Sequence, residues 1–164
     1  MQLLVADAGP LIALAVGNVL PQAAKQFELC VPQAVLDECL ADSYTPGVQA
    51  ILKVSCKSNF SLIAASLIKP LDSAYSLGLG SGEVAVLSYA KQHTLTALID
   101  ERRARRVAKQ VGVAVVGSGA VLVALKNAGL LTSIAPALRA WQDHGYFLSP
   151  LVREQLLTAA HEST

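Results

Sequence analysis

The fold is decided by a short apolar strand that runs into an acidic residue and then into a helix: Leu3-Leu4-Val5-Ala6-Asp7-Ala8-Gly9-Pro10-Leu11-Ile12. The same form recurs later in the chain, as Leu95-Thr96-Ala97-Leu98-Ile99-Asp100-Glu101-Arg102. Buried parallel strands are mostly apolar along their whole length, which fits both runs. Because parallel strands end at the same edge of a sheet, Asp7 and Asp100 are candidates for one site at that edge.

The rest of the sequence alternates short apolar runs with helical stretches, a pattern typical of a parallel sheet with helices on both faces. We predict five strands, at Leu3–Ala6, Leu29–Val31, Ser61–Ala64, Leu95–Ile99 and Val113–Val116. We predict helices at 32–41, from a Thr45-Pro46 start, at 80–92, 101–110, 118–127 and 132–144, and from Ser149-Pro150 onward. The expected fold class is a three-layer α/β domain covering residues 1–164. Its last helices, at about 132–161, are expected to pack on the core or on a dimer partner.

Composition narrows the class of protein. A chain of 164 residues that is 53% hydrophobic and 15% charged suits one folded domain and is not disordered. Its longest apolar stretches, Leu3–Leu20 and Val111–Leu125, are interrupted or too short for the roughly 20 residues that a membrane helix needs. No Lys or Arg precedes the first apolar run, so we predict no secretory signal and a cytoplasmic location. The cysteines form no CxxC pair and are predicted to be reduced, buried packing residues: Cys30, Cys39 and Cys56.

Two further acidic residues stand where they could join Asp7 and Asp100. Glu38 lies in a helix among apolar neighbours, and Glu83 lies in the first turn of a helix that follows Gly80-Ser81-Gly82. Each of the four has an ordinary alternative role. An Asp after a strand is often a helix N-cap, Glu38 could be a surface residue at the edge of an apolar stripe, and the helix dipole favours a first-turn Glu.

Convergence of these carboxylates constrains the function. Two like charges about 4 Å apart repel by about 4 kcal/mol at an effective dielectric constant near 20, close to the lower end of a domain's total stability. A divalent cation would compensate, because Mg²⁺ and Mn²⁺ prefer hard oxygen ligands and commonly bridge carboxylates to a substrate phosphate. Such a site can polarise a phosphodiester and supply a hydroxide-like nucleophile.

Five of the 13 basic residues lie in one short stretch, which predicts an anion-attracting patch: Arg102, Arg103, Arg105, Arg106 and Lys109. Arg pairs bidentately with phosphate, so the stretch fits an RNA substrate, although it could also be a solvated helix face. A spacing of four places Arg102 with Arg106 and Arg105 with Lys109. The aromatic residues are scattered rather than interleaved with this stretch, so the sequence does not support sequence-specific readout by stacking: Tyr44, Tyr75, Tyr89, Trp141 and Tyr146.

At this point the sequence resembles the PIN-domain family, and in particular its branch of VapC-type toxins. The resemblance rests on four segments in order, which are Asp7–Leu14, Val31–Glu38, Gly82–Leu87 and Leu98–Arg105, together with Val116-Gly117-Ser118 and the last two helices. It implies a metal-dependent endoribonuclease, often the toxin of a toxin–antitoxin pair with a small antitoxin partner, and often a homodimer. It also implies that Asp7, Glu38, Glu83 and Asp100 are the catalytic, metal-binding set for Mg²⁺ or Mn²⁺. Arg102, Arg103, Arg105 and Arg106 are the expected contacts to RNA phosphate. Many relatives carry Ser or Thr where this chain has Gly9, so support for the site is expected from elsewhere.

Other classes of protein fit less well. A haloacid-dehalogenase-like phosphatase needs a second Asp at the position of Gly9, and a receiver domain needs an acidic pair and a Lys that are absent. The run Gly78-x-Gly80-x-Gly82 follows no clear strand and lacks a P-loop Lys, so nucleotide binding of that kind is not predicted. The alternative that stays open is a catalytically weak PIN-like module that binds RNA or protein.

Overall fold

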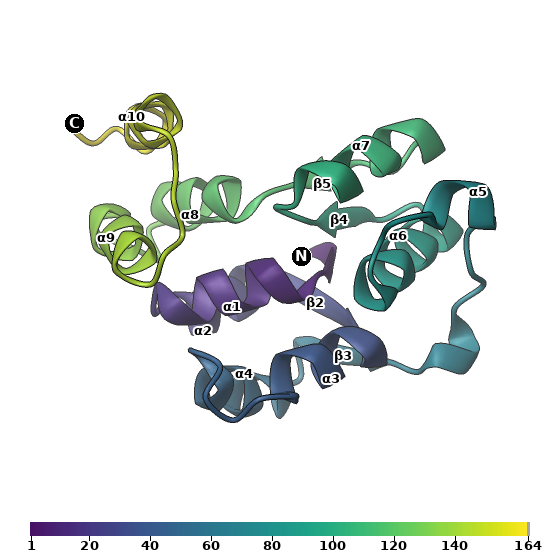
Figure 1. Ribbon diagram of the computed structural model, residues 1–164. Coiled ribbons are helices and arrows are strands. Elements are labelled where there is room, and N and C mark those ends of the chain that lie inside the picture. The colour runs from purple at the N-terminus through teal and green to yellow at the C-terminus, as the bar shows by residue number, and fades with distance from the viewer. Residues whose placement is uncertain (164) are drawn as a thin grey trace.

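The computed structural model describes residues 1–163 and contains a five-stranded, fully parallel sheet in the order β3-β2-β1-β4-β5. Its strands are β1 (Gln2–Ala6), β2 (Phe27–Pro32), β3 (Phe60–Ile63), β4 (Thr96–Leu98) and β5 (Val115–Val116). Each of them falls where a strand was predicted. The predicted fold class, an α/β domain with about five mainly parallel strands between helices, is confirmed (Figure 1).

Helices cover both faces of the sheet (Figure 1). On one side lie α5 (Ser73–Ser76), α6 (Ser81–His93) and α7 (Arg102–Val111). On the other lie α1 (Ala8–Val16), α2 (Leu20–Gln26), α4 (Val48–Ser55), α8 (Ser118–Asn127) and α9 (Ala135–Asp143). The chain also contains α3 (Gln33–Leu40), a short 3-10 helix η1 (Ala65–Leu67) and α10 (Pro150–Ala159). None of the described helices is both long and apolar enough to cross a bilayer.

The sheet order reverses at β1, and this reversal positions the site. The chain adds β2 and β3 on one side of β1 and then returns to add β4 and β5 on the other. In doubly wound sheets, ligands bind at such a switch point, beyond the carboxyl ends of the strands. Here those ends belong to β1 and β4, which pair in parallel with Ala6 opposite Leu98.

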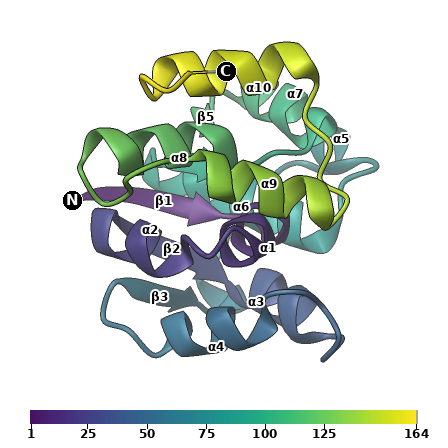
Figure 2. The ribbon, with the colours of Figure 1, turned by 90° about the vertical axis from the view of Figure 1, so that its left-hand side faces the viewer.

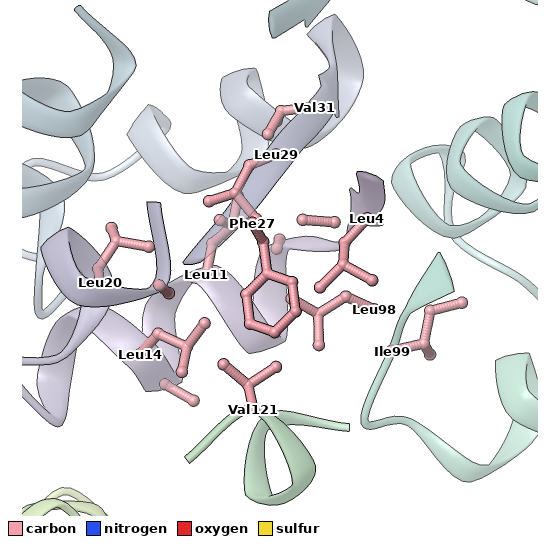
Figure 3. Close-up of a cluster of buried hydrophobic side chains, with 14 of the residues drawn as sticks. Leu4, Leu11, Leu14, Leu20, Phe27, Leu29, Val31, Leu98, Ile99 and Val121 are labelled. Atoms are coloured by element: carbon pink, nitrogen blue, oxygen red, sulfur yellow. The ribbon is translucent and has the colours of Figure 1, made fainter. Parts of the chain in front are cut away.

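The core lies between the sheet and its helices. Figure 3 shows Leu4 and Phe27 from the sheet meeting Leu11 and Leu14 of α1 and Val121 of α8. All of these side chains are buried, and full burial of a side chain of this size contributes roughly 1.5–3 kcal/mol. The apolar strands and the first helix are therefore held in place by the same contacts, which fixes the turn between them.

Some predicted boundaries are wrong. The helix predicted from Thr45-Pro46 begins later, at Val48, after Gly47, whose φ of +83° is left-handed. A methyl group on Gly47 would lie 2.5 Å from Ala15 Cβ, so this position requires glycine. The helix can start only after the left-handed turn at Gly47. The helix predicted from Thr132 starts at Ala135. Helix α2 was not predicted at all.

The C-terminal helices are attached to the rest of the fold at two close approaches. Trp141 of α9 is buried, and its indole Nε1 donates a 2.7 Å hydrogen bond to the carbonyl of Ala13 in α1. Helix α10 lies beside α8 at the top of Figure 2, where Leu156 packs over Gly119. A connection of residues 144–149 joins α9 to α10.

Candidate functional site

The site begins where β1 ends. Asp7 follows this strand directly, and its backbone amide donates a 3.0 Å hydrogen bond to the carbonyl of Leu98 in β4. This bond ties the turn after β1 to the end of β4, two residues before Asp100. The two aspartates that follow strands are thus brought to one edge of the sheet, as the strand-end pattern predicts.

The environment of Asp7 disfavours the charged form of its carboxyl group. It is only 6% exposed, and although it occupies the N-cap position of α1, its side chain makes no capping hydrogen bond. Burial raises the pKa of its carboxyl to about 6, against the opposing effect of the Ala8 amide, and the negative charges of Glu83, Glu38 and Asp100 raise it further. The residues whose charges act on Asp7 are therefore the three other predicted acids.

Glu38 reaches toward Asp7 across a glycine. A methyl group on Gly82 would lie 2.9 Å from Glu38 Oε2 and 3.6 Å from Asp7 Oδ1, so Gly82 separates the two carboxylates at close range. The side chain of Glu38 is exposed on α3, which packs against α6. The absence of a side chain at Gly82 is what lets a residue on α3 approach the end of β1.

Glu83 has the ordinary role that its position suggests, and it also contributes to the site. Its Oε2 accepts a 2.8 Å hydrogen bond from the backbone amide of Gly80, which caps the start of α6. Of the three charges that raise the pKa of Asp7, that of Glu83 nonetheless has the largest effect. The helix dipole and the amide of Gly80 thus hold a carboxylate at the edge of the site.

Asp100 does not cap α7, the helix that follows it. That role belongs to Glu101, whose Oε2 accepts a 2.7 Å hydrogen bond from the amide of Ala104 at the start of α7. Asp100 is instead held by Ser118, whose amide donates to Oδ1 at 2.8 Å and whose hydroxyl donates to Oδ2. Ser118 is 3% exposed and opens α8 just after β5, so a third strand end supports the site.

The four acids offer carboxylate oxygens, which are the ligands that hard divalent cations prefer. Within residues 1–163, no group of three or more His, Cys, Asp or Glu side chains lies close enough together to hold a metal ion. Glu83 and Asp100 are turned onto the amides of Gly80 and Ser118. Yet the buried Asp7 is surrounded by acids rather than by bases, an arrangement that Mg²⁺ or Mn²⁺ would neutralise.

The basic stretch divides between two directions. Arg102 and Arg105 line a pocket of about 560 Å³ that also contains Asp100 and Ser118, and Arg105 Nη1 donates a 3.2 Å hydrogen bond to the carbonyl of Ile99. Arg103 instead lies over the backbone of Gly78, and neither it nor Arg106 lines the pocket. The spacing of four paired Arg102 with Arg106. At the pocket, Arg102 instead lies with Arg105.

Sequence reasoning missed several residues at this edge. Ser118 could have been found by applying the strand-end rule to β5 as well as to β1 and β4. Tyr146 lies in the connection between α9 and α10, and burial, with the charges of Asp100 and Cys39, raises the pKa of its phenol. Cys39 is buried behind the acids, and burial together with Glu38 and Asp7 raises the pKa of its thiol to about 12. Cys56, predicted to be buried, is exposed at the end of α4.

Comparisons with known proteins agree with this fold. The profile of the family DUF3368, described as a PIN domain, matches residues 3–162. Among solved structures, the chain is similar to a PilT N-terminus domain protein from the hyperthermophilic archaeon Sulfolobus solfataricus P2, with a TM-score of 0.56 and 13% identity over 76% of this chain and 93% of that one. This likeness shows the fold alone. A search of curated proteins found no match.

Proposed function

Because this chain belongs to the PIN-domain family, we propose that it is a divalent-metal-dependent endoribonuclease that hydrolyses RNA phosphodiester bonds. The observation that carries the proposal is the environment of Asp7. A buried carboxylate whose pKa is raised to about 6 by its burial and by the charges of three further acids costs the metal-free fold stability. Such a cost is expected where the acids serve a cation that binds among them.

The proposed division of labour follows from the contacts. Asp7, Glu38, Glu83 and Asp100 would hold the ion, with Asp7 fixed by its burial and Asp100 by its hydrogen bonds to Ser118. When bound, Mg²⁺ or Mn²⁺ supplies Lewis-acid polarisation of the phosphate and lowers the pKa of a water molecule. Ser118 fixes the orientation of Asp100 through its two donated hydrogen bonds, and such supporting contacts are often needed for metal binding.

The RNA would approach over α7. Arg102 and Arg105 lie in the same pocket as Asp100, so their guanidinium groups would pair with backbone phosphate next to the metal-binding acids. Arg103 and Arg106, which do not line this pocket, would bind phosphate further along the strand or contribute only to the overall positive field.

A catalytically weak RNA- or protein-binding module is the second candidate. The observation that favours it is the placement of Glu83 and Asp100, whose oxygens bind amides of the protein rather than converge with Asp7. In this version the acids would be a remnant of a metal site, and the arginines would bind RNA without cleavage.

We further propose that the protein is a homodimer and the toxin of a toxin–antitoxin pair, inhibited by a small antitoxin protein. Exposed apolar side chains support a protein partner: Leu67, Tyr75 and Leu77 between β3 and α6, and Leu151 on α10. Such exposed apolar groups are common at protein interfaces. Sedimentation that shows only a monomer at micromolar concentration would count against the dimer, and purification from the native host with no small companion would count against the antitoxin.

The cleavage test uses a labelled RNA of mixed sequence with EDTA, Mg²⁺ or Mn²⁺. Wild type is compared with Asp7→Asn and Asp100→Asn, each shown to be folded by its thermal transition. Cleavage that needs metal and is lost in both variants is the expected result. If the wild type binds RNA but cuts none of it in any metal, the binding module replaces the nuclease.

A further inference from the structure

The pocket beside Asp100 has two chemically different sides. One side is basic and polar and comes from α7 and the start of α8, with Arg102, Arg105 and Ser118. The other is aromatic and apolar and comes largely from the connection of residues 144–149, with Tyr146 and Phe147. The volume of the whole pocket, about 560 Å³, lies in the range of small-molecule sites.

The guanidinium of Arg105 on the basic side is held in position by its neighbours. Arg105 is anchored by its bond to the carbonyl of Ile99, and a methyl group on Gly117 would lie 2.8 Å from Arg105 Nη1 and 3.0 Å from Asp100 Oδ1. The bare backbone at Gly117 therefore lets a guanidinium and a carboxylate approach each other at the end of β5. An anion bound by Arg105 would lie next to the metal-binding acids.

On the aromatic side, the ring of Phe147 is exposed to solvent, and burial in the core does not account for its presence there. Phe147 is 86% exposed, although most Phe side chains in a domain are largely buried. Its backbone is not loose at the pocket, because the amide of the preceding Tyr146 donates a 2.8 Å hydrogen bond to the carbonyl of Trp141, and Ser149 caps α10. The ring is thus presented at the rim by ordered neighbours on both sides.

We propose that this pocket holds one unpaired nucleotide of the RNA strand next to the scissile phosphate, with its phosphate on Arg102 and Arg105 and its base against Tyr146 and Phe147. This inference rests on the proposed function. It also adds base stacking that the scattered aromatic residues of the sequence did not predict, because the fold brings Tyr146 and Phe147 beside the basic stretch. A base can enter such a pocket only when it is unpaired, so the site selects single-stranded segments over duplexes.

The test measures binding in EDTA, where no cleavage interferes. A short fluorescent single-stranded RNA is titrated with wild type, with Phe147→Ala, and with Tyr44→Ala as the matched control, since Tyr44 is 90% exposed and lies outside the pocket. We expect Phe147→Ala to weaken binding about tenfold, the lower range for loss of one stacked base, and Tyr44→Ala to bind as wild type does. Arg102→Gln should weaken binding more than Arg106→Gln on the same helix.

Competitors identify what the pocket recognises. Adenosine monophosphate should displace the labelled RNA at lower concentration than ribose phosphate, and duplex RNA of equal length should compete poorly. Equal competition by ribose phosphate, or unchanged binding by Phe147→Ala, would overturn the inference. If Phe147→Ala instead converts a dimer to a monomer and leaves RNA binding unchanged, the ring serves a protein interface and the inference also fails.

The same preparations separate this inference from the proposed function. Binding that depends on Phe147 without cleavage in Mn²⁺ or Mg²⁺ would retain the nucleotide pocket and reject the nuclease. Metal-dependent cleavage that Phe147→Ala performs as well as wild type would retain the nuclease and reject the pocket.

Discussion

Ser118 donates two hydrogen bonds to the carboxylate of Asp100, one from its backbone amide to Oδ1 at 2.8 Å and one from its hydroxyl to Oδ2. One residue at the end of β5 thereby fixes both oxygens of an acid at the end of β4. Ser118 is buried while Asp100 is exposed, so the contact anchors a solvent-accessible carboxylate to the interior of the fold.

Replacement of Ser118 tests this support. Ser118→Ala keeps the amide donor and removes the hydroxyl, so we expect Mn²⁺ affinity and RNA cleavage to fall by roughly 10–100-fold, as for other residues that orient metal ligands. Calorimetric titration with Mn²⁺ and single-turnover cleavage measure the two effects. Ser118→Thr, which retains the hydroxyl, should recover most of the loss, and an alanine variant with wild-type affinity would show that the hydroxyl is dispensable.

Asp7 should make the metal-free protein less stable as the pH rises. Its pKa is about 6 when folded and about 3.8 in the reference state, so between these values the folded state binds more protons than the unfolded state. Stability therefore falls as the pH rises from about 4 to about 6, by up to about 3 kcal/mol, and the loss is complete at neutral pH. Asp7→Asn should remove this slope and raise the stability in EDTA at pH 7.

Urea unfolding in EDTA at several pH values measures the effect. The comparison of Asp7→Asn with Asp143→Asn, an exposed aspartate at the end of α9, controls for the general loss of a negative charge. Equal pH profiles for wild type and Asp7→Asn would contradict the raised pKa.

Gly82 should be required for the site but not for the fold. A methyl group there would approach Glu38 Oε2 to 2.9 Å, and the flexible Glu38 side chain would move away at little cost in stability. We expect Gly82→Ala to lower cleavage at least tenfold, because the displaced carboxylate no longer reaches the ion, with a thermal midpoint close to that of wild type.

Gly9→Ala is the matched control, since Gly9 also lies in the first turn of a helix at the site and its added methyl group would meet no atom within 4 Å. If Gly9→Ala and Gly82→Ala cleave RNA equally well, the approach of Glu38 to Asp7 has no role in the reaction.

Trp141 should contribute to the stability of the whole fold. Trp141→Phe leaves the ring space mostly filled but removes the donor to the carbonyl of Ala13, so we expect a loss of about 1–3 kcal/mol from an unpaired buried acceptor. A single unfolding transition at lower denaturant concentration is the expected result. An unchanged midpoint would show that α9 is only loosely attached to α1.

The sequence predicts the frame of the site well and its details poorly. Five apolar strands and the acids after β1 and β4 follow from local pattern, because buried parallel strands are apolar and all end at the same edge of the sheet. The approach of Glu38 across Gly82 and the joining of Phe147 to Arg102 depend on distances between segments far apart in the chain. Local periodicity carries no information about such contacts. The start of α4 was misplaced for the same reason, since Gly47 is set by its contact with Ala15.

The most direct test of the account is the position of a bound metal ion. Crystals of the protein soaked in Mn²⁺ would be measured for anomalous scattering, beside crystals of Asp7→Asn treated in the same way. We predict a strong peak among Asp7, Glu38, Glu83 and Asp100, with carboxylate oxygens at about 2.0–2.3 Å, and its loss or marked weakening in the variant. No peak among these residues in a preparation that cleaves RNA would contradict the claim that the four acids form one metal site.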